Sequence, residues 1–163
     1  MKIVTNLHHM SRPTTPVKYD GQMPSGAIKL IRYLQTHRRD AVGISANQLG
    51  IDQRVCAFWD GVKITVLVNP EIIGTPDTTI HTSLEQEGCL SLPKKSYDVI
   101  RWSWVKVKAD NHVSPLLYNG WTARVVQHEI DHLDGITIKD RASEVDEETN
   151  ALMNSNYKPQ KGA

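Results

Sequence analysis

The chain has 163 residues, 39% of them hydrophobic and 23% charged, a balance typical of one globular domain. Nineteen basic residues against eighteen acidic ones leave a formal charge of +1, which argues against a nucleic-acid-binding surface. Two cysteines are too few for a disulfide-stabilised secreted fold. No apolar stretch approaches the roughly 18 residues of a membrane span, and the N-terminus lacks a leader pattern. We therefore expect a cytoplasmic monomer without membrane contacts.

The first half of the chain predicts an arm, a helix and a hairpin. Residues 1–24 contain three prolines and no regular period, which indicates an extended arm on the domain surface. From Ser25, a plausible N-cap, apolar residues recur at helical spacing, so we expect an amphipathic helix that ends near Asp40. Two β-rich runs, 55–58 and 64–68, are joined across Asp60 and Gly61, which is a hairpin signal.

The second half predicts one half-buried strand and one central helix. Residues 102–109 alternate between apolar and basic side chains, as an antiparallel strand with one solvated face does. Residues 121–133 fit a helix that is apolar on most sides, which must lie at the centre of the domain. Its polar residues are confined to a narrow edge, and Gly135 suits its C-terminal end; the edge comprises Arg124, Gln127, Asp131 and Asp134.

These elements predict an α+β domain in which antiparallel sheets pack around the central helix, with the amphipathic helix near the N-terminus. We expect the catalytic domain to span residues 1–141. Residues 142–163 form a polar tail that can begin as a short helix at Ser143, which has a capping-box pattern, and then become disordered.

The central helix carries the pattern His-Glu-x-x-His at residues 128–132. The spacing i, i+4 places His128 and His132 on one helix face about one turn apart, as two ligands of a single metal require. Glu129 is rotated by about 100° from His128, so it can accept a proton from water beside the metal instead of coordinating. A hydrolytic metal site also needs a third protein ligand and an open position for water.

The third ligand has several candidates in the sequence alone. A metzincin-type protease would need histidine at position 138, which holds Ile138. A thermolysin-like protease would need a glutamate from a following helix, and only Glu144, Glu147 and Glu148 are placed for that role. Cys89 follows Glu87 and Gly88 at an expected turn or strand end, and its thiolate could complete a His₂Cys set. Cys56 lies in the predicted apolar strand, so we expect it to be a core residue.

Three blocks in this order resemble the signature of the peptide deformylases, whose patterns are G-φ-G-φ-A-A-x-Q, E-G-C-φ-S and Q-H-E-x-D-H. Here they read AVGISANQ at 41–48, EGCLS at 87–91 and QHEIDH at 127–132, and the second and third match fully. The resemblance covers roughly residues 1–141. It implies an enzyme that removes the N-formyl group from formyl-methionyl peptides and releases formate. The alternatives are a zincin-type metallopeptidase and a non-catalytic His₂Cys metal-binding module.

The resemblance also implies a role for each matching residue. Cys89, His128 and His132 hold the metal, Glu129 is the general acid and base, and Gln48 with the main-chain N–H of Leu90 meets the oxyanion. The peptide pairs with the loop at Gly43, and the methionine side chain enters an apolar pocket lined by Val42, Gly43, Leu90, Val125 and His128. A thiolate with two imidazoles suits Fe²⁺, with Zn²⁺, Ni²⁺ or Co²⁺ as substitutes, and the family is known for using iron.

The chain departs from the family pattern at two positions of the first block and in its tail. Ala41 replaces a glycine, which would strain the loop if the position required a positive φ. Ser45 replaces an alanine, and its hydroxyl must either find a hydrogen-bond partner or face solvent. The tail lacks the long basic helix that many bacterial members use at the ribosome, so ribosome docking is not expected; it resembles the tail of truncated, including phage-encoded, members. Arg101 and Asp131 are a candidate pair that braces the metal site.

Overall fold

The computed structural model describes residues 2–77 and 82–142. The helical segments within these ranges are α1 (Leu7–Met10), α2 (Ser25–Thr36), the 3₁₀ turn η1 (Ala46–Leu49) and α3 (Gly120–Leu133). The strands are β1 (Gly43–Ser45), β2 (Val55–Trp59), β3 (Ile64–Val68), β4 (Glu71–Gly74), β5 (Thr82–Cys89), β6 (Leu92–Trp102), β7 (Trp104–Lys108) and β8 (Leu116–Asn119). A final helical turn occupies residues 138–142.

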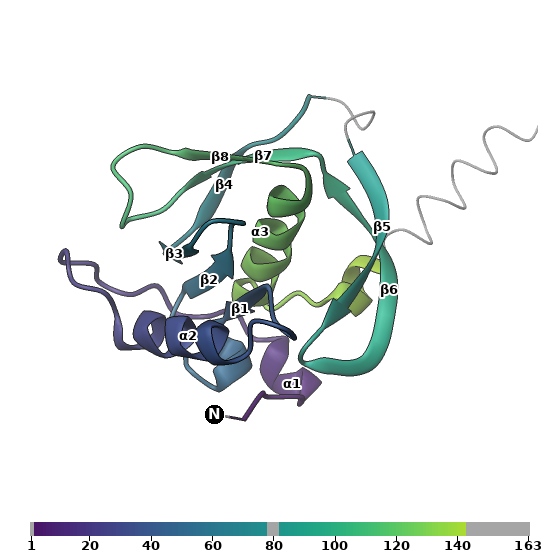
Figure 1. The fold of residues 1–163 in the computed structure, drawn as a ribbon, viewed down its shortest axis with the longest axis horizontal. Coiled ribbons are helices and arrows are strands. Elements are labelled where there is room, and N and C mark those ends of the chain that lie inside the picture. The colour runs from purple at the N-terminus through teal and green to yellow at the C-terminus, as the bar shows by residue number, and fades with distance from the viewer. Residues whose placement is uncertain (1, 78–81, 143–163) are drawn as a thin grey trace, which may run out of the picture.

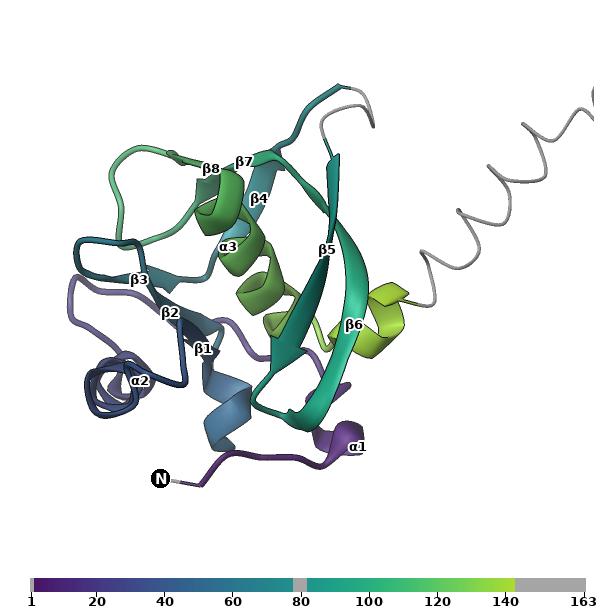
Figure 2. The ribbon, with the colours of Figure 1, turned by 45° about the vertical axis from the view of Figure 1, so that its right-hand side comes forward.

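The strands form three antiparallel sheets that surround α3 (Figure 1). Their strand orders are β1-β2-β3, β4-β7-β8 and β5-β6. The β5–β6 hairpin is a long twisted ribbon on one side of α3, and α2 covers the outer face of the first sheet (Figure 2). The predicted α+β class with antiparallel sheets is therefore confirmed. The arrangement leaves α3 in contact with β1, β2, β6, β7 and β8.

The β2–β3 hairpin is apolar on both faces because each face has its own cover. Cys56, Phe58 and Leu67 pack toward α3, whereas the intervening side chains of β2 and β3 pack against α2. Successive strand residues point to opposite faces, so a strand between two layers reads as a continuous apolar run. Cys56 is fully buried in this core, as expected. In β7, Val105 and Val107 are buried and the intervening lysines are exposed, which agrees with a half-solvated strand.

Three local expectations differ from the structure. The N-cap of α2 is Pro24, not Ser25, and the helix ends at Thr36, because His37 already leaves helical geometry. The N-terminal arm includes α1, and Met10 is fully buried at its end. Trp104 begins a new strand, while Trp102 belongs to β6. The β5–β6 hairpin carried no clear sequence signal, because exposed polar residues at 94–96 and 98 interrupt the apolar pattern of β6.

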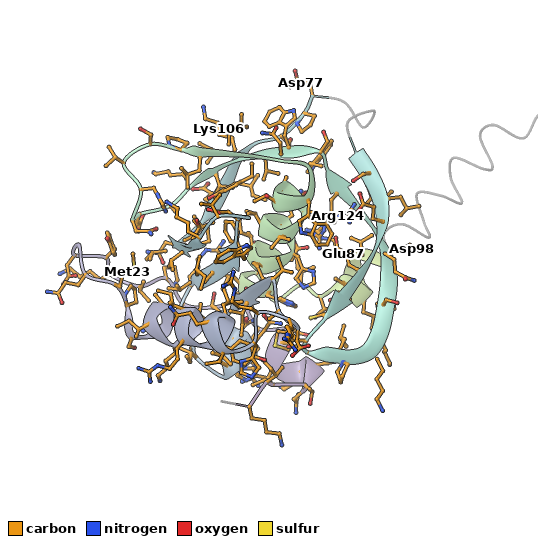
Figure 3. All side chains as sticks on the ribbon, viewed as in Figure 1. Met23, Asp77, Glu87, Asp98, Lys106 and Arg124 are labelled. Atoms are coloured by element: carbon orange, nitrogen blue, oxygen red, sulfur yellow. The ribbon has the colours of Figure 1, made fainter. Side chains whose placement is uncertain are left out.

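The narrow polar edge of α3 does not face solvent. Arg124, Gln127 and Asp131 are all buried, although the sequence pattern assigned them to the outside. The β5–β6 hairpin covers this edge and supplies partners for its charges (Figure 3), which a helical wheel does not reveal. Trp121, by contrast, lies near the start of α3 and is 60% exposed.

The predicted short helix at Ser143 and the predicted disorder beyond it lie outside the described residues. Within residues 2–77 and 82–142, the helices are all too short or too polar to cross a bilayer.

Gly135 follows the end of α3, where both its backbone conformation and a close neighbouring main chain disfavour a side chain. Substituting Gly135 therefore tests the fold. Its φ is +76°, and an added Cβ would lie 2.7 Å from the main-chain oxygen of Ser11. Gly135→Ala should therefore lower the free energy of unfolding by more than about 2 kcal/mol, because left-handed strain adds to a collision with backbone. Urea denaturation followed by circular dichroism measures this change.

Gly50→Ala is the matched control. Gly50 has a similar φ of +72°, but its nearest neighbour is a Val4 methyl at 3.7 Å, an ordinary contact. This variant should lose only about 1–2 kcal/mol from left-handed strain. Equal losses in the two variants would contradict the role assigned to the Ser11 contact.

Candidate functional site

One cavity of about 510 Å³ opens between β1, the end of β5 and α3. All the sequence-predicted substrate-binding residues line it: Val42, Gly43, Leu90, Val125 and His128. Gln48, Cys89 and Glu129 line it as well. Residues from three separate blocks of the sequence therefore meet at one concave surface. Lys94, Lys95 and Trp121 also line the cavity and were not singled out by the sequence.

Three candidate metal ligands meet at the inner end of this cavity. Their ligand atoms, contributed by Cys89, His128 and His132, all lie within 4.8 Å of one another. Sγ of Cys89 is 3.2 Å from Nε2 of His132, which is 3.1 Å from Nε2 of His128. The histidines follow each other by one turn of α3, and Cys89 is the last residue of β5. A thiol and two imidazole nitrogens at such short separations form a suitable donor set for one divalent ion.

The charges around this cluster favour a cation. Burial by itself lowers the pKa of His128, but its hydrogen bonds with Cys89 and Glu87 raise that pKa to about 10. The negative charge of Glu87, which faces Nδ1 of this imidazole, would also favour a metal ion held by Nε2. Burial and the neighbouring charge of His128 keep the pKa of His132 well below its ordinary value. His132 is thus neutral, as an imidazole ligand must be. The residues present fit a divalent metal.

Glu87 fixes the orientation of His128. One carboxylate oxygen of Glu87 is 2.9 Å from Nδ1 of His128, so Nε2 is the ring nitrogen turned toward Cys89 and His132. Arg101 and Arg124 donate to the same carboxylate at 3.0 Å and 2.6 Å. Although burial alone raises the pKa of Glu87, its hydrogen bonds with His128 and Arg101 hold it well below the ordinary range. Figure 3 shows Glu87 and Arg124 between α3 and the hairpin.

Asp131 extends this network away from the metal ligands. Arg101 donates to one carboxylate oxygen of Asp131, which confirms the predicted pair. Arg141 donates to the other oxygen at 2.6 Å, and so ties the last described helical turn to α3. Both Arg101 and Asp131 are buried. Because a buried ion pair is costly to break, this network rigidly connects β6, α3 and the end of the domain.

The predicted acid–base residue Glu129 lies on α3, and the predicted oxyanion donor Gln48 lies in η1. Glu129 is only 4% exposed, and burial raises the pKa of its carboxyl against the opposing charge of His128 and a hydrogen bond from Ser45. Gln48 is buried too, and its Nε2 points toward Ser91 Oγ at 3.3 Å and Cys89 Sγ at 3.7 Å. A carboxyl with a raised pKa and an amide donor beside a candidate metal site suit hydrolysis.

The two departures in the first block have clear structural outcomes. Ala41 does not adopt a positive φ, so the strain considered for this position does not arise; among the described non-glycine residues only Asn69 and Lys94 do. The Ser45 hydroxyl finds its partner in Glu129, at 2.6 Å from Oε2 and 2.8 Å from the main-chain oxygen.

Sequence reasoning missed two anchors of the site and misjudged a third. Asn47 donates to the main-chain oxygen of His132 at 2.6 Å, and Ser91 accepts from Gln48. Both residues lie within the family-like sequence blocks at 41–48 and 87–91, and this position is the sequence signal that could have identified them. Arg124 lies one turn before His128 on the same helix, and a helix buried on all other sides leaves little room for a solvated arginine.

Comparison with known proteins agrees with this geometry. The family model described as "Polypeptide deformylase" matches residues 2–148. A peptide deformylase of Thermotoga petrophila is 34% identical over 141 residues, which cover 84% of this chain and 81% of that protein. The crystal structure of peptide deformylase from Thermotoga maritima has a TM-score of 0.75 at 30% identity and covers 86% of this chain and 95% of its own.

A further solved structure is a class I type b peptide deformylase from Acinetobacter baumannii with Met-Ala-Ser bound. It has a TM-score of 0.74 at 28% identity and covers 86% of this chain and 98% of its own. The family model spans most of the chain, including every residue that lines the cavity. By fold, by sequence and by the residues that surround the cavity, the chain belongs to the polypeptide deformylase family.

Proposed function

We propose that this chain removes the formyl group from formyl-methionyl peptides through Glu129, with Cys89, His128 and His132 as the ligands of one divalent metal. Family membership makes it a deformylase. The observation that carries the residue assignment is the convergence of one thiol and two imidazoles, with ligand atoms within 4.8 Å of one another, at a cavity that Cys89, His128, Glu129 and Gln48 line. A closed structural metal site would need neither a buried carboxyl nor an amide donor.

We infer that the metal is Fe²⁺, with Zn²⁺, Ni²⁺ or Co²⁺ as substitutes, because a thiolate with two imidazoles is a softer ligand set than two histidines and a carboxylate. When bound, the metal supplies Lewis acidity, which lowers the pKa of water and polarises a carbonyl. Glu87 contributes by fixing the ring of His128, and Asn47 by holding the main chain at His132.

Glu129 handles the proton in this proposal. Its buried carboxylate accepts a proton from the attacking water as the new C–O bond forms on the formyl carbon. It then delivers that proton to the amine as the C–N bond breaks, so formate and a free N-terminus leave. Burial raises the pKa of the Glu129 carboxyl, which favours its accepting the proton that it later returns. Gln48 and the main-chain N–H of Leu90 stabilise the oxyanion, each donor contributing about 3 kcal/mol.

The peptide itself is proposed to pair with β1. Among the described strands, β1 lies at the edge of its sheet and pairs with β2 alone, and Val42 and Gly43 line the cavity beside it. An extended peptide can add to such an edge through its main chain. The methionine side chain would then enter the cavity toward Leu90 and Val125. A cytoplasmic location follows if the substrates are newly made chains. No feature of the described residues supports ribosome docking or any particular oligomeric state.

The alternative functions have less support. Ile138 is 1% exposed and packs with Leu92 and Val99, so position 138 belongs to the core and not to a metal site. Glu144, Glu147 and Glu148 lie outside the described residues, and the family assignment does not favour a peptidase.

The iron-loaded protein, handled without oxygen, should release formate from formyl-Met-Ala-Ser and leave acetyl-Met-Ala-Ser intact. Formate is quantified with a coupled dehydrogenase, and the peptides are resolved by mass spectrometry. Cleavage of internal peptide bonds at a comparable rate would instead indicate a metallopeptidase, and no reaction with either peptide would exclude the proposed function.

Glu129→Gln should lower kcat by at least about a thousandfold while retaining metal, because an amide cannot accept the proton. Steady-state formate release and metal analysis on the same sample measure both properties. Glu71→Gln, at an exposed position of β4, is the control and should match the unsubstituted protein. Near-normal turnover of Glu129→Gln would remove Glu129 from the proton-transfer role.

Cys89→Ser should weaken metal binding by at least about tenfold, since it replaces a thiolate with a poorer ligand. Competition with a chromophoric chelator gives the affinity. Cys56→Ala is the control, because Cys56 is buried in the core and should change stability without changing metal affinity. Unchanged affinity in Cys89→Ser would show that Cys89 is not a ligand.

A further inference from the structure

Ser45 and Gly43 lie on the same face of β1, directly against the carboxylate of Glu129. They are two residues apart in a strand, so their side-chain directions agree, whereas Ile44 between them points into the core under α2. A Cβ on Gly43 would lie 2.4 Å from Oε1 of Glu129. Ser45 Oγ lies 2.6 Å from Oε2. One strand therefore contacts both oxygens of this carboxylate, one by close packing and the other by a hydrogen bond.

The Ser45 hydroxyl has one hydrogen and two acceptors within reach. The main-chain oxygen of Glu129 is at 2.8 Å and the carboxylate oxygen Oε2 at 2.6 Å. The contact with Oε2 is the shorter of the two, so we assign the hydroxyl hydrogen to Oε2. Ser45 is fully buried and Glu129 nearly so, hence no water competes for this bond. With Oε2 occupied in this way, Oε1 is the oxygen left for the reaction.

The main chain of Ser45 orients the second proposed catalytic group. Its N–H donates to Oε1 of Gln48 at 2.9 Å. An amide whose oxygen is held on one side must direct its NH₂ to the other, and Nε2 of Gln48 does point toward Ser91 and Cys89. A single residue thus contacts both the acid–base carboxyl and the oxyanion donor.

From this geometry we propose that Ser45 is a positioning residue for the reaction: its hydroxyl holds the Glu129 carboxylate in the orientation that proton transfer requires. The inference rests on the proposed role of Glu129. It assigns a purpose to the hydroxyl at a position where the family pattern has alanine. Because alanine fills that position in the pattern, Ser45→Ala removes only the oxygen, and the variant is expected to fold.

Ser45→Ala should lower kcat for formyl-Met-Ala-Ser by about tenfold with KM within twofold, since one charge-assisted hydrogen bond is lost and the substrate contacts remain. Metal affinity and the urea midpoint should stay close to those of the unsubstituted protein. A crystal structure of the variant should show the Glu129 carboxylate rotated or in two conformers. Thr14→Val is the matched control: Thr14 is buried, and its hydroxyl bonds to the main-chain oxygen of Leu133 on the same helix and not to the Glu129 carboxylate. It should leave kcat unchanged.

The same substitution in a Glu129→Gln background separates positioning from a general structural effect. If Ser45 acts through Glu129, Ser45→Ala should cause no further loss there in single-turnover measurements. An equal fall in both backgrounds, a fall accompanied by loss of metal or stability, or an unchanged kcat in Ser45→Ala alone would each overturn the inference. Failure of the unsubstituted, iron-loaded protein to release formate would instead overturn the proposed function.

Discussion

The buried carboxylate of Glu87 is the interaction on which the site depends. It lies on β5 and receives hydrogen bonds from Arg101 on β6 and from Arg124 and His128 on α3. A charge taken out of water is tolerated only where its partners are close and well oriented. Because these partners come from different elements, satisfying Glu87 requires the β5–β6 hairpin to sit against α3 in one register. Glu87 and Cys89 are two residues apart in β5, so the same register brings the thiol beside the histidines.

The hydrogen bonds around Glu87 also help to hold the candidate metal ligands in place. His128 is held at Nδ1 by Glu87, and Asn47 on η1 holds the main chain at His132. Arg101 continues the network to Asp131 and Arg141. The three donor atoms are thereby held close together by contacts from the hairpin, the 3₁₀ turn and the end of the domain. Such support is what a site needs if its ligands are to hold a metal without rearrangement.

The reactive groups on the other side of the cavity are arranged by a much shorter stretch of chain. Gly43, Ser45 and Gln48 lie within six residues, and β1 followed by η1 places all three against α3 or Cys89. Gly43 is required because α3 approaches so closely that a Cβ would meet Glu129. The family's alanine at position 45 would pack here without a hydrogen bond, so the serine adds a polar contact to an otherwise steric one. The short segment formed by β1 and η1, packed against α3, therefore sets the position of the Glu129 carboxylate that is proposed to transfer the proton.

Sequence patterns alone predict the central helix at 121–133, the β2–β3 hairpin and the blocks that bear the candidate site residues, since periodicity, turn residues and short spacing are properties of neighbouring residues. They could not determine the β5–β6 hairpin, the burial of Arg124, Gln127 and Asp131, or the role of Glu87. Those depend on partners distant in the chain: Glu87 meets His128 across 41 residues and Arg124 across 37. Only tertiary packing decides whether a polar residue faces water or a buried partner, because desolvation and pairing are settled by what lies opposite it in space.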